Sequence, residues 1–300
     1  MSTTNRFGAI ESGGTKVICG WSDEHGNILE QCRIPTTTPL EVINEVISFF
    51  LSVSDSGSIR PDGVGIGTFG PVNLQKDSSH YGTILKTPKP GWEGANLVNP
   101  IRTLFPGTRV VIDTDVNAAA LGEMRWGAAQ DISDLVYFTI GTGIGCGVIS
   151  NGNPLHGLVH PEVGHLRIPR SDEDRRSFKG ICPFHDDCLE GIASGPAMQA
   201  RWVEPASELP ANHQAWDYEA DALAWACVNM IVTVSPRRII IGGGVSQARW
   251  LFPKIREKVV TRLNGYVDVP EITEQIEDFI VPPQLGQDAG LKGAIALVLP

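Results

Sequence analysis

The stretch FGAIESGGTKVICG at residues 7–20 indicates the fold. It is an extended apolar segment that Gly13-Gly14-Thr15-Lys16 divides into two parts, which is the pattern of two strands joined by a glycine turn. A second short strand follows from Ile28 to Ile34. The same order of strand, glycine turn and strand returns at 135–150, around Gly141-Thr142-Gly143-Ile144-Gly145. This repetition predicts two similar α/β domains, each opening with a loop of the size that a phosphate group needs.

Helical patterns surround these strands. Thr38-Pro39-Leu40-Glu41 is a capping box with proline at the first helical position, and apolar residues at helical spacing predict an amphipathic helix over 39–53. Residues 114–124 form an alanine-rich helix, and 216–234 are apolar on nearly all faces, which is typical of a buried helix. The last helix, roughly 288–299, is apolar, and we expect it to pack on the first domain.

These elements place the boundary between the two domains near residue 118. We expect an N-terminal domain at 1–118, to which the C-terminal segment 286–300 returns. The C-terminal domain then spans 119–285 and contains a loop-rich insert at 155–190. No low-complexity linker separates the two, so the connection is expected to be short and hinge-like.

Composition limits the classes of function. The 300 residues carry a formal net charge of −10, which argues against a nucleic-acid surface as the main partner. No apolar run approaches the roughly 20 residues of a membrane span. The first residues have no apolar signal core, so we expect a cytoplasmic protein without a membrane partner. The six cysteines do not follow the pattern of a secreted disulfide scaffold.

Three glycine loops follow strands: Gly13-Gly14-Thr15, Gly141-Thr142-Gly143 and Gly242-Gly243-Gly244. Glycine lets the backbone approach a phosphate group closely, so that consecutive N–H groups can bind the anion. A single loop of this kind is more often an ordinary hairpin turn. Three together favour a nucleoside triphosphate as the ligand.

Acidic residues stand at the junction of a strand and a helix, in Asp113-Thr114-Asp115-Val116-Asn117. Asp115 could accept the proton of a substrate hydroxyl, as phosphoryl transfer requires. The alternative is that Asp113 or Asp115 caps the helix. Side chains two apart on an extended segment point the same way, so spacing does not decide between the two carboxylates.

The insert carries the most specific local signal. Four residues with nitrogen or sulfur ligand atoms lie in two clusters: His165, Cys182, His185 and Cys188. This set and spacing suit tetrahedral zinc, and the alternative is two free cysteines and two surface histidines. Glu162 and Glu190 flank the cluster and could accept hydrogen bonds from hydroxyl groups, or could be solvated surface acids.

Together these residues resemble those of the ROK sugar kinases, which share the actin-like, ribonuclease H-like two-domain ATPase fold with hexokinase. The resemblance covers nearly the whole chain. It rests on Glu11–Lys16, Asp113–Asn117 with Gly122-Glu123, Gly141–Gly145, Glu162–His165, the Cys/His cluster with Glu190, and Gly242–Gly244. Within the family, the bacterial fructokinase branch is similar at Gly67–Val72, Tyr81-Gly82 and Thr87–Trp92.

The resemblance implies a kinase that uses ATP and Mg²⁺ and binds its substrates in an interdomain cleft. The ATP-binding residues that it implies are Gly13, Gly14, Thr15, Lys16, Gly141, Thr142, Gly143, Gly243 and Gly244. The sugar-binding residues that it implies are Gly70, Asn117, Glu162, His165 and Glu190, with Asp115 as catalytic base. Zinc would be held by His165, Cys182, His185 and Cys188. Many members are homodimers, so a homodimer is expected.

Two features depart from the family pattern. Glu11 stands where most of the superfamily has Asp, which leaves its contact with Mg²⁺ open, and Asp113-Thr114-Asp115 replaces the usual Glu-Asn-Asp. Some members are transcriptional repressors with an N-terminal helix-turn-helix. Here the phosphate loop begins at residue 11, so we expect no DNA-binding segment.

The sequence therefore predicts an ATP-dependent hexose kinase, with D-fructose, converted to fructose 6-phosphate, as the expected substrate. A kinase for glucose, mannose or an N-acetylhexosamine is the alternative within this class. A sugar-responsive binding protein without catalysis is the alternative from another class. The retained Asp115 speaks against it.

Overall fold

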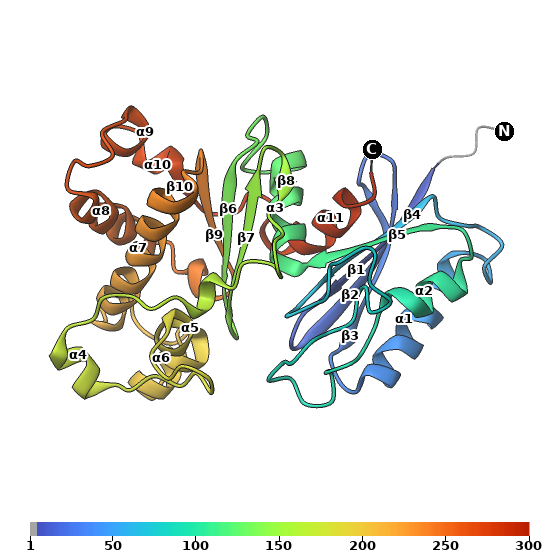
Figure 1. Ribbon diagram of the computed structural model, residues 1–300, viewed down its shortest axis with the longest axis horizontal. Helices are drawn as coiled ribbons and strands as arrows, with labels where there is room; N and C mark the ends of the chain where they lie inside the picture. The colour runs from blue at the N-terminus through green and yellow to red at the C-terminus, as the bar shows by residue number, and fades with distance from the viewer. Residues whose placement is uncertain (1–4, 300) are drawn as a thin grey trace. The chain divides into compact units, whose positions relative to one another are not determined.

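The computed structural model describes residues 5–299, which divide into two compact units, each with one five-stranded sheet (Figure 1). Unit 1 holds the residues up to Gln130, Pro154–His160, and the residues from Leu285 onward. Unit 2 holds Asp131–Asn153 and Pro161–Gln284. The chain therefore passes from unit 1 to unit 2 more than once.

The sheet of unit 1 has the strand order β3-β2-β1-β4-β5. The first three strands are antiparallel neighbours in two successive hairpins, whereas β1, β4 and β5 are parallel. The carboxyl ends of β1, β4 and β5 consequently lie at one edge of the sheet. The strands are β1 (Arg6–Ser12), β2 (Lys16–Asp23), β3 (Ile28–Pro35), β4 (Gly63–Thr68) and β5 (Arg109–Thr114).

Helices cover both faces of this sheet. Alternate strand residues face opposite sides, so Ile10 packs in the cluster with α1 (Pro39–Val53) and α2 (Val98–Leu104), while Ala9 packs with α11 (Ala289–Ala296). Helix α1 begins at the capping box that the sequence predicts, because the Thr38 side chain accepts from Glu41 N and Glu41 reaches back to the Thr38 backbone.

Helix α3 (Asp115–Trp126) belongs wholly to unit 1, whereas we had expected the first domain to end at 118. The reason is its packing against α11. A Cβ at Gly122 would lie 2.8 Å from the carbonyl oxygen of Ala289, so glycine is what allows the two helices to approach. Residues Pro154–His160 also join unit 1, although we had placed 155–160 in the C-terminal insert.

The sheet of unit 2 has the order β8-β7-β6-β9-β10, which repeats that of unit 1 strand for strand. A glycine turn again joins the two strands of the first hairpin, β6 and β7. Strand β9 then pairs in parallel with β6, on the side away from β7. The prediction of two similar α/β domains is thereby confirmed. The strands are β6 (Leu135–Ile140), β7 (Ile144–Ser150), β8 (Asn153–Pro154), β9 (Arg238–Gly242) and β10 (Ile280–Val281).

Helices of unit 2 pack around the long, buried α7 (Ala215–Val234), which the sequence predicts at 216–234. The next helix, α8 (Leu251–Leu263), follows a separate 3₁₀ turn, η2 (Val245–Gln247). The shorter elements are η1 (Val163–His165), α4 (Asp172–Ser177), α5 (Leu189–Ala193), α6 (Gly195–Trp202), α9 (Pro270–Thr273) and α10 (Ile276–Phe279). Among the described residues, no helix has both the length and the apolar character needed to cross a bilayer.

Candidate functional site

The first glycine loop is the turn between β1 and β2. Gly13 N donates to Lys16 O at 2.9 Å, and neighbouring segments hold the loop from outside. The Thr36 hydroxyl donates to Gly13 O at 2.8 Å, and Lys89 Nζ donates to Gly14 O at 2.7 Å. A Cβ built at Gly14 would meet no atom within 4 Å, so the backbone there faces open space. A fixed loop with an open backbone is what an anion-binding turn requires.

Buried hydroxyl groups lie side by side at the carboxyl ends of the parallel strands of unit 1. Ser12 pairs with Thr68, and Thr68 with Thr114, so the three residues form one row across β1, β4 and β5. Ser12 Oγ and Thr68 Oγ1 are buried without a hydrogen-bond partner. Buried polar groups are normally satisfied, so the two hydroxyls indicate a ligand or water at this edge. Sequence reasoning did not name them.

Both carboxylate oxygens of Asp113 contact other groups of the protein. One carboxylate oxygen accepts from Thr114 N and from Asn117 Nδ2, each at 2.7 Å. The other lies 2.9 Å from His156 Nε2. Through its hydrogen bond, Asp113 raises the pKa of His156, against a smaller opposing effect of burial. The alternative that an aspartate caps α3 is wrong, because the Thr114 hydroxyl accepts the capping hydrogen bond from Asn117 N.

Asp115 is the first residue of α3, and its carboxylate accepts from Val116 N at 2.9 Å. Burial of the carboxyl group raises the pKa of Asp115 to about 6, with the backbone N–H groups of Val116 and Asp115 opposing the rise. A carboxylate with a raised pKa is a stronger base than an ordinary one, and it titrates near working pH. Asp113 thus contacts three neighbouring groups of the protein, whereas burial leaves Asp115 with a raised pKa.

Glu11, near the end of β1, lies near Asp115. Burial raises the pKa of Glu11 to about 7, Lys16 lowers it, and the charges of Asp115 and Asp288 add to the rise. Its Oε2 is buried without a hydrogen-bond partner. An unsatisfied carboxylate oxygen among acidic neighbours fits a divalent cation, which would satisfy the oxygen and offset the negative charge.

Of the expected sugar residues of unit 1, Asn117 contacts Asp113, and Gly70 lies beside His160. Asn117 is buried, and while its Nδ2 donates to Asp113, its Oδ1 has no hydrogen-bond partner. A Cβ at Gly70 would lie 3.0 Å from the ring of His160, whose Nε2 accepts from Val72 N. A cavity of about 340 Å³ lies between residues 72–75, Leu85 and residues 156–159. Neither His156 nor His160 was assigned from the sequence.

The glycine loops of unit 2 are held by specific contacts. Gly195 N donates to Gly141 O at 2.8 Å, and Ile144 N donates to Glu190 Oε2 at 2.9 Å. Glu190, expected at the sugar, therefore also positions the loop that contains Thr142 and Gly143. Gly243 follows β9 with φ +91, and a Cβ there would collide with the backbone of Ile140. A Cβ at Gly244 would meet open space.

The four expected zinc ligands come together in unit 2. The ligand atoms of His165, Cys182, His185 and Cys188 all lie within 4.8 Å of one another. Cys182 Sγ lies 3.8 Å from Nδ1 of both histidines, and Cys188 Sγ lies 3.5 Å from His165 Nδ1. Zinc–sulfur and zinc–nitrogen bonds of usual length place tetrahedral ligands roughly 3.6 Å apart. The donor set and spacing fit zinc.

The Cys/His cluster is formed by local structure. Cys182 and Asp186 exchange two backbone hydrogen bonds in a tight turn that carries Cys182 and His185. Cys188 precedes the first turn of α5, and His165 ends η1. Both histidines present Nδ1 to the cluster, so Nε2 of His165 lies on the other side of its ring. Glu162, expected at the sugar, immediately precedes η1 and is exposed.

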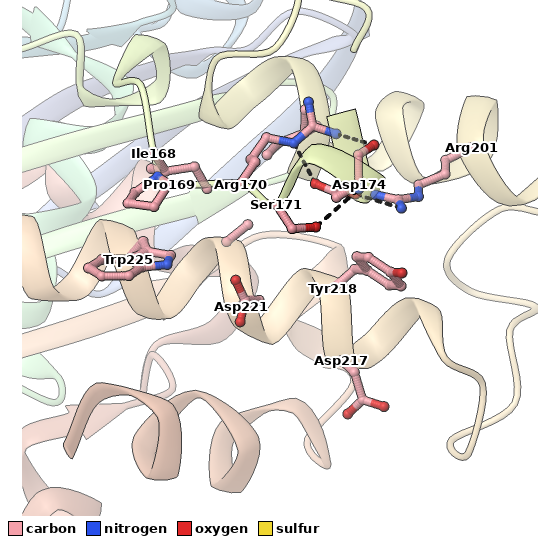
Figure 2. Close-up of a pocket in the computed structure, with 12 residues that line it drawn as sticks. Ile168, Pro169, Arg170, Ser171, Asp174, Arg201, Asp217, Tyr218, Asp221 and Trp225 are labelled. Atoms are coloured by element: carbon pink, nitrogen blue, oxygen red, sulfur yellow. Dashed lines mark hydrogen bonds and ion pairs between the residues drawn. The ribbon is translucent and has the colours of Figure 1, made fainter. Parts of the chain in front are cut away.

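A cavity of about 430 Å³ in unit 2 contains none of the expected site residues (Figure 2). Arg170 and Arg201 both point to Asp174 there, with ion pairs of 2.5 and 2.7 Å. Burial disfavours the charge on Asp174, but the two guanidinium groups outweigh it and lower the pKa of its carboxyl group. Arg201 also lies 4.0 Å from the ring centre of Tyr218. These polar groups pair with one another, which is typical of side chains that stabilise the fold.

With Asp115 as the catalytic base that the sequence predicts, its raised pKa predicts how activity depends on pH. A base acts only when it is deprotonated, so kcat/KM should fall as the pH drops through about 6. The pH profile of kcat/KM between about 5 and about 8 measures this. In a His156→Gln control the acid-side inflection should persist, because His156 contacts Asp113 rather than Asp115. A rate that stays constant down to pH of about 5 would contradict the assignment.

The ROK family model matches residues 7–300. The chain belongs to the ROK family. Among curated relatives of this ROK protein, a fructokinase of Pediococcus pentosaceus is 42% identical over 292 residues, covering 97% of this chain and 96% of the relative. A fructokinase of Zymomonas mobilis is 40% identical over 295 residues, covering 98% and 96%. Relatives named glucokinase are less similar, at 28%, 29% and 35% identity.

The fold of this ROK protein matches solved structures of the family. A ROK hexokinase from Thermus thermophilus superposes with a TM-score of 0.76 over 98% of this chain and 97% of that one, at 23% identity. At this identity the match concerns the fold alone. It confirms the predicted two-domain α/β fold class.

Proposed function

We propose that this protein is an ATP-dependent fructokinase, which converts D-fructose and ATP to fructose 6-phosphate and ADP. The observation that carries the proposal is the 40 to 42% identity, over at least 97% of the chain, to relatives named fructokinase. The carboxylate of Asp115, with its raised pKa, supports it independently. A coupled assay of ADP release with and without sugar tests it directly.

The proposed catalytic base is Asp115. It accepts the proton of the sugar hydroxyl while that oxygen attacks the γ-phosphorus and the bond from phosphorus to the β-phosphate oxygen breaks. Asp113, held by Thr114, Asn117 and His156, keeps the start of α3 in place. Asn117 Oδ1 is unsatisfied and suits a sugar hydroxyl as donor. Gly70, Glu162, His165 and Glu190 are the other proposed sugar contacts.

The proposed ATP contacts are backbone groups of the glycine loops together with Thr15, Lys16 and Thr142. Gly14 and Gly244 support this role because their backbones face open space. Mg²⁺ would accompany ATP and neutralise charge on the phosphoryl oxygens, and Glu11 is its proposed protein contact.

Zinc at the Cys/His cluster would fix the conformation of the insert, so the proposed role of the zinc is structural. We further propose a cytoplasmic homodimer with no nucleic-acid partner.

Fructose is expected to be preferred over glucose in kcat/KM. A site that pairs the hydroxyl groups of one sugar rejects another strongly, because mismatched polar groups remain unpaired. Initial rates over a panel of fructose, glucose, mannose, N-acetylglucosamine and N-acetylmannosamine measure this. Faster turnover of any other sugar would favour the alternative hexose kinase. Sugar binding without ADP release by the wild-type protein would favour a non-catalytic binding protein.

A further inference from the structure

Cys19 on β2 and Cys32 on β3 are directly opposite each other in an antiparallel pair. Both side chains belong to the face of the sheet that packs against α1 and α2, since Cys19 lies in that core cluster and Cys32 packs against it. The two thiols therefore lie on one face of the sheet at the same level. The ROK features described above leave this pair without a role.

The backbone spacing of such a pair matches a disulfide. Residues that face each other across antiparallel strands have Cα atoms about 4.5 to 5.5 Å apart. Disulfides span Cα distances of about 4.4 to 6.8 Å. A bond between Cys19 and Cys32 therefore needs no separation or shift of β2 and β3.

The environments of the two thiols differ in a way that suits oxidation. Cys32 is only half-buried, whereas Cys19 has no exposed surface. A hydrogen bond from Cys19 lowers the pKa of Cys32 to about 7, and the same contact raises the pKa of Cys19. Burial and the carboxylate of Glu45 oppose the lowering at Cys32. Thiolate character and access are the two requirements for reaction with peroxide.

We propose that Cys19 and Cys32 form a redox-modifiable dithiol that hydrogen peroxide converts to a disulfide across β2 and β3. The Cys32 thiolate attacks one oxygen of the peroxide and becomes a sulfenic acid, while the other oxygen leaves and takes up a proton as water. The Cys19 sulfur then attacks Cys32 sulfur, and the second water leaves with the Cys19 proton. Two thiols lose two electrons in total, and one peroxide is reduced to two waters.

The disulfide would act on the strands that hold the first glycine loop. Lys16 begins β2, and at the end of β3 the Thr36 hydroxyl donates to Gly13 O while Thr36 N donates to Thr15 O. The bond between Cys19 and Cys32 would join these two strands covalently within a few residues of the loop. The proposal concerns this chemistry and does not depend on which sugar the protein phosphorylates.

The sequence makes the test direct. Trypsin cleaves after Lys16 and Arg33, and the fragment between them contains Cys19 and Cys32 but no other cysteine. The full-length protein is treated with graded hydrogen peroxide, its remaining thiols are blocked with N-ethylmaleimide, and it is digested without reductant. The expected result is the fragment 17–33 lighter by two hydrogen atoms and unlabelled, with both thiols restored by dithiothreitol.

Variants separate the two steps. In Cys19→Ser, which keeps a hydrogen-bond donor beside Cys32, Cys32 should stop at a sulfenic acid that dimedone traps, and in Cys32→Ser, Cys19 should stay reduced. Cys227→Ala, at a buried cysteine of unit 2, is the matched control and should still form the disulfide. The proposal fails if the wild-type fragment keeps both thiols at peroxide levels that oxidise free glutathione. It also fails if Cys32 proceeds to sulfinic acid while Cys19 stays reduced.

Discussion

Replacing Asp115 by Asn should lower kcat by about 10² to 10⁴, the usual cost of losing a general base. Asparagine keeps the shape of the side chain and can still accept the hydrogen bond from Val116 N, but it cannot take up the proton. The affinity for ATP should change little, because its phosphates are expected to bind the glycine loops. Steady-state kinetics with fructose, together with nucleotide binding measured by calorimetry, provide both readouts.

Asp113→Asn is the matched control, two residues away. Its amide can retain one acceptor for Asn117 Nδ2 but loses the charge that pairs with His156. We expect a milder loss of kcat, through disturbed positioning of Asn117 and the start of α3. A near-normal kcat in Asp115→Asn, or a deeper loss in Asp113→Asn, would show that the wrong carboxylate has been assigned.

Cys182→Ser should remove zinc from the protein and disorder the insert. The cluster joins four side chains from residues 165–188, a region with few regular elements of its own, so metal binding would provide much of the free energy that keeps this region folded. Elemental analysis should find one zinc per wild-type chain and close to none in the variant. Activity should fall as well, because His165 is a proposed sugar contact.

A cysteine outside the cluster supplies the control for the zinc experiment. Cys146→Ser changes a buried thiol of β7 in the same unit and should retain the metal. Limited proteolysis should then cut the insert in Cys182→Ser but not in Cys146→Ser. Wild-type protein that contains no zinc, and whose activity survives a chelator, would disprove the zinc site.

Local patterns were sufficient for much of the fold. The capping box at Thr38 and Glu41 begins α1 in the structure, and the spacing of Cys182, His185 and Cys188 predicted a cluster that does form. These features depend on residues close in sequence, where hydrogen bonding and side-chain periodicity act directly. The repeated hairpins and the family resemblance also predicted two similar α/β domains, which the two sheets confirm.

Features that depend on register between distant segments could not be predicted. More than 40 residues of sequence separate Ser12 from Thr68, and Thr68 from Thr114. Only the parallel pairing of β1, β4 and β5 places the three in one row. Similarly, the approach of His156 to Asp113 depends on the return of residues 154–160 to unit 1. The boundary that we expected at 118 falls within α3, which joins unit 1 because it packs on α11, a helix far later in the sequence.

The position of α11 has a consequence for synthesis of the protein on the ribosome. The face of the first sheet that contains Phe7, Ala9 and Ile18 is covered by Leu291, Ala294 and Ile295, which are translated long after those strands. Until α11 has emerged from the ribosome, the early strands cannot complete their core, and apolar surface stays exposed. A premature stop codon just before α11 would therefore leave a nascent chain that chaperones and proteases recognise as incomplete.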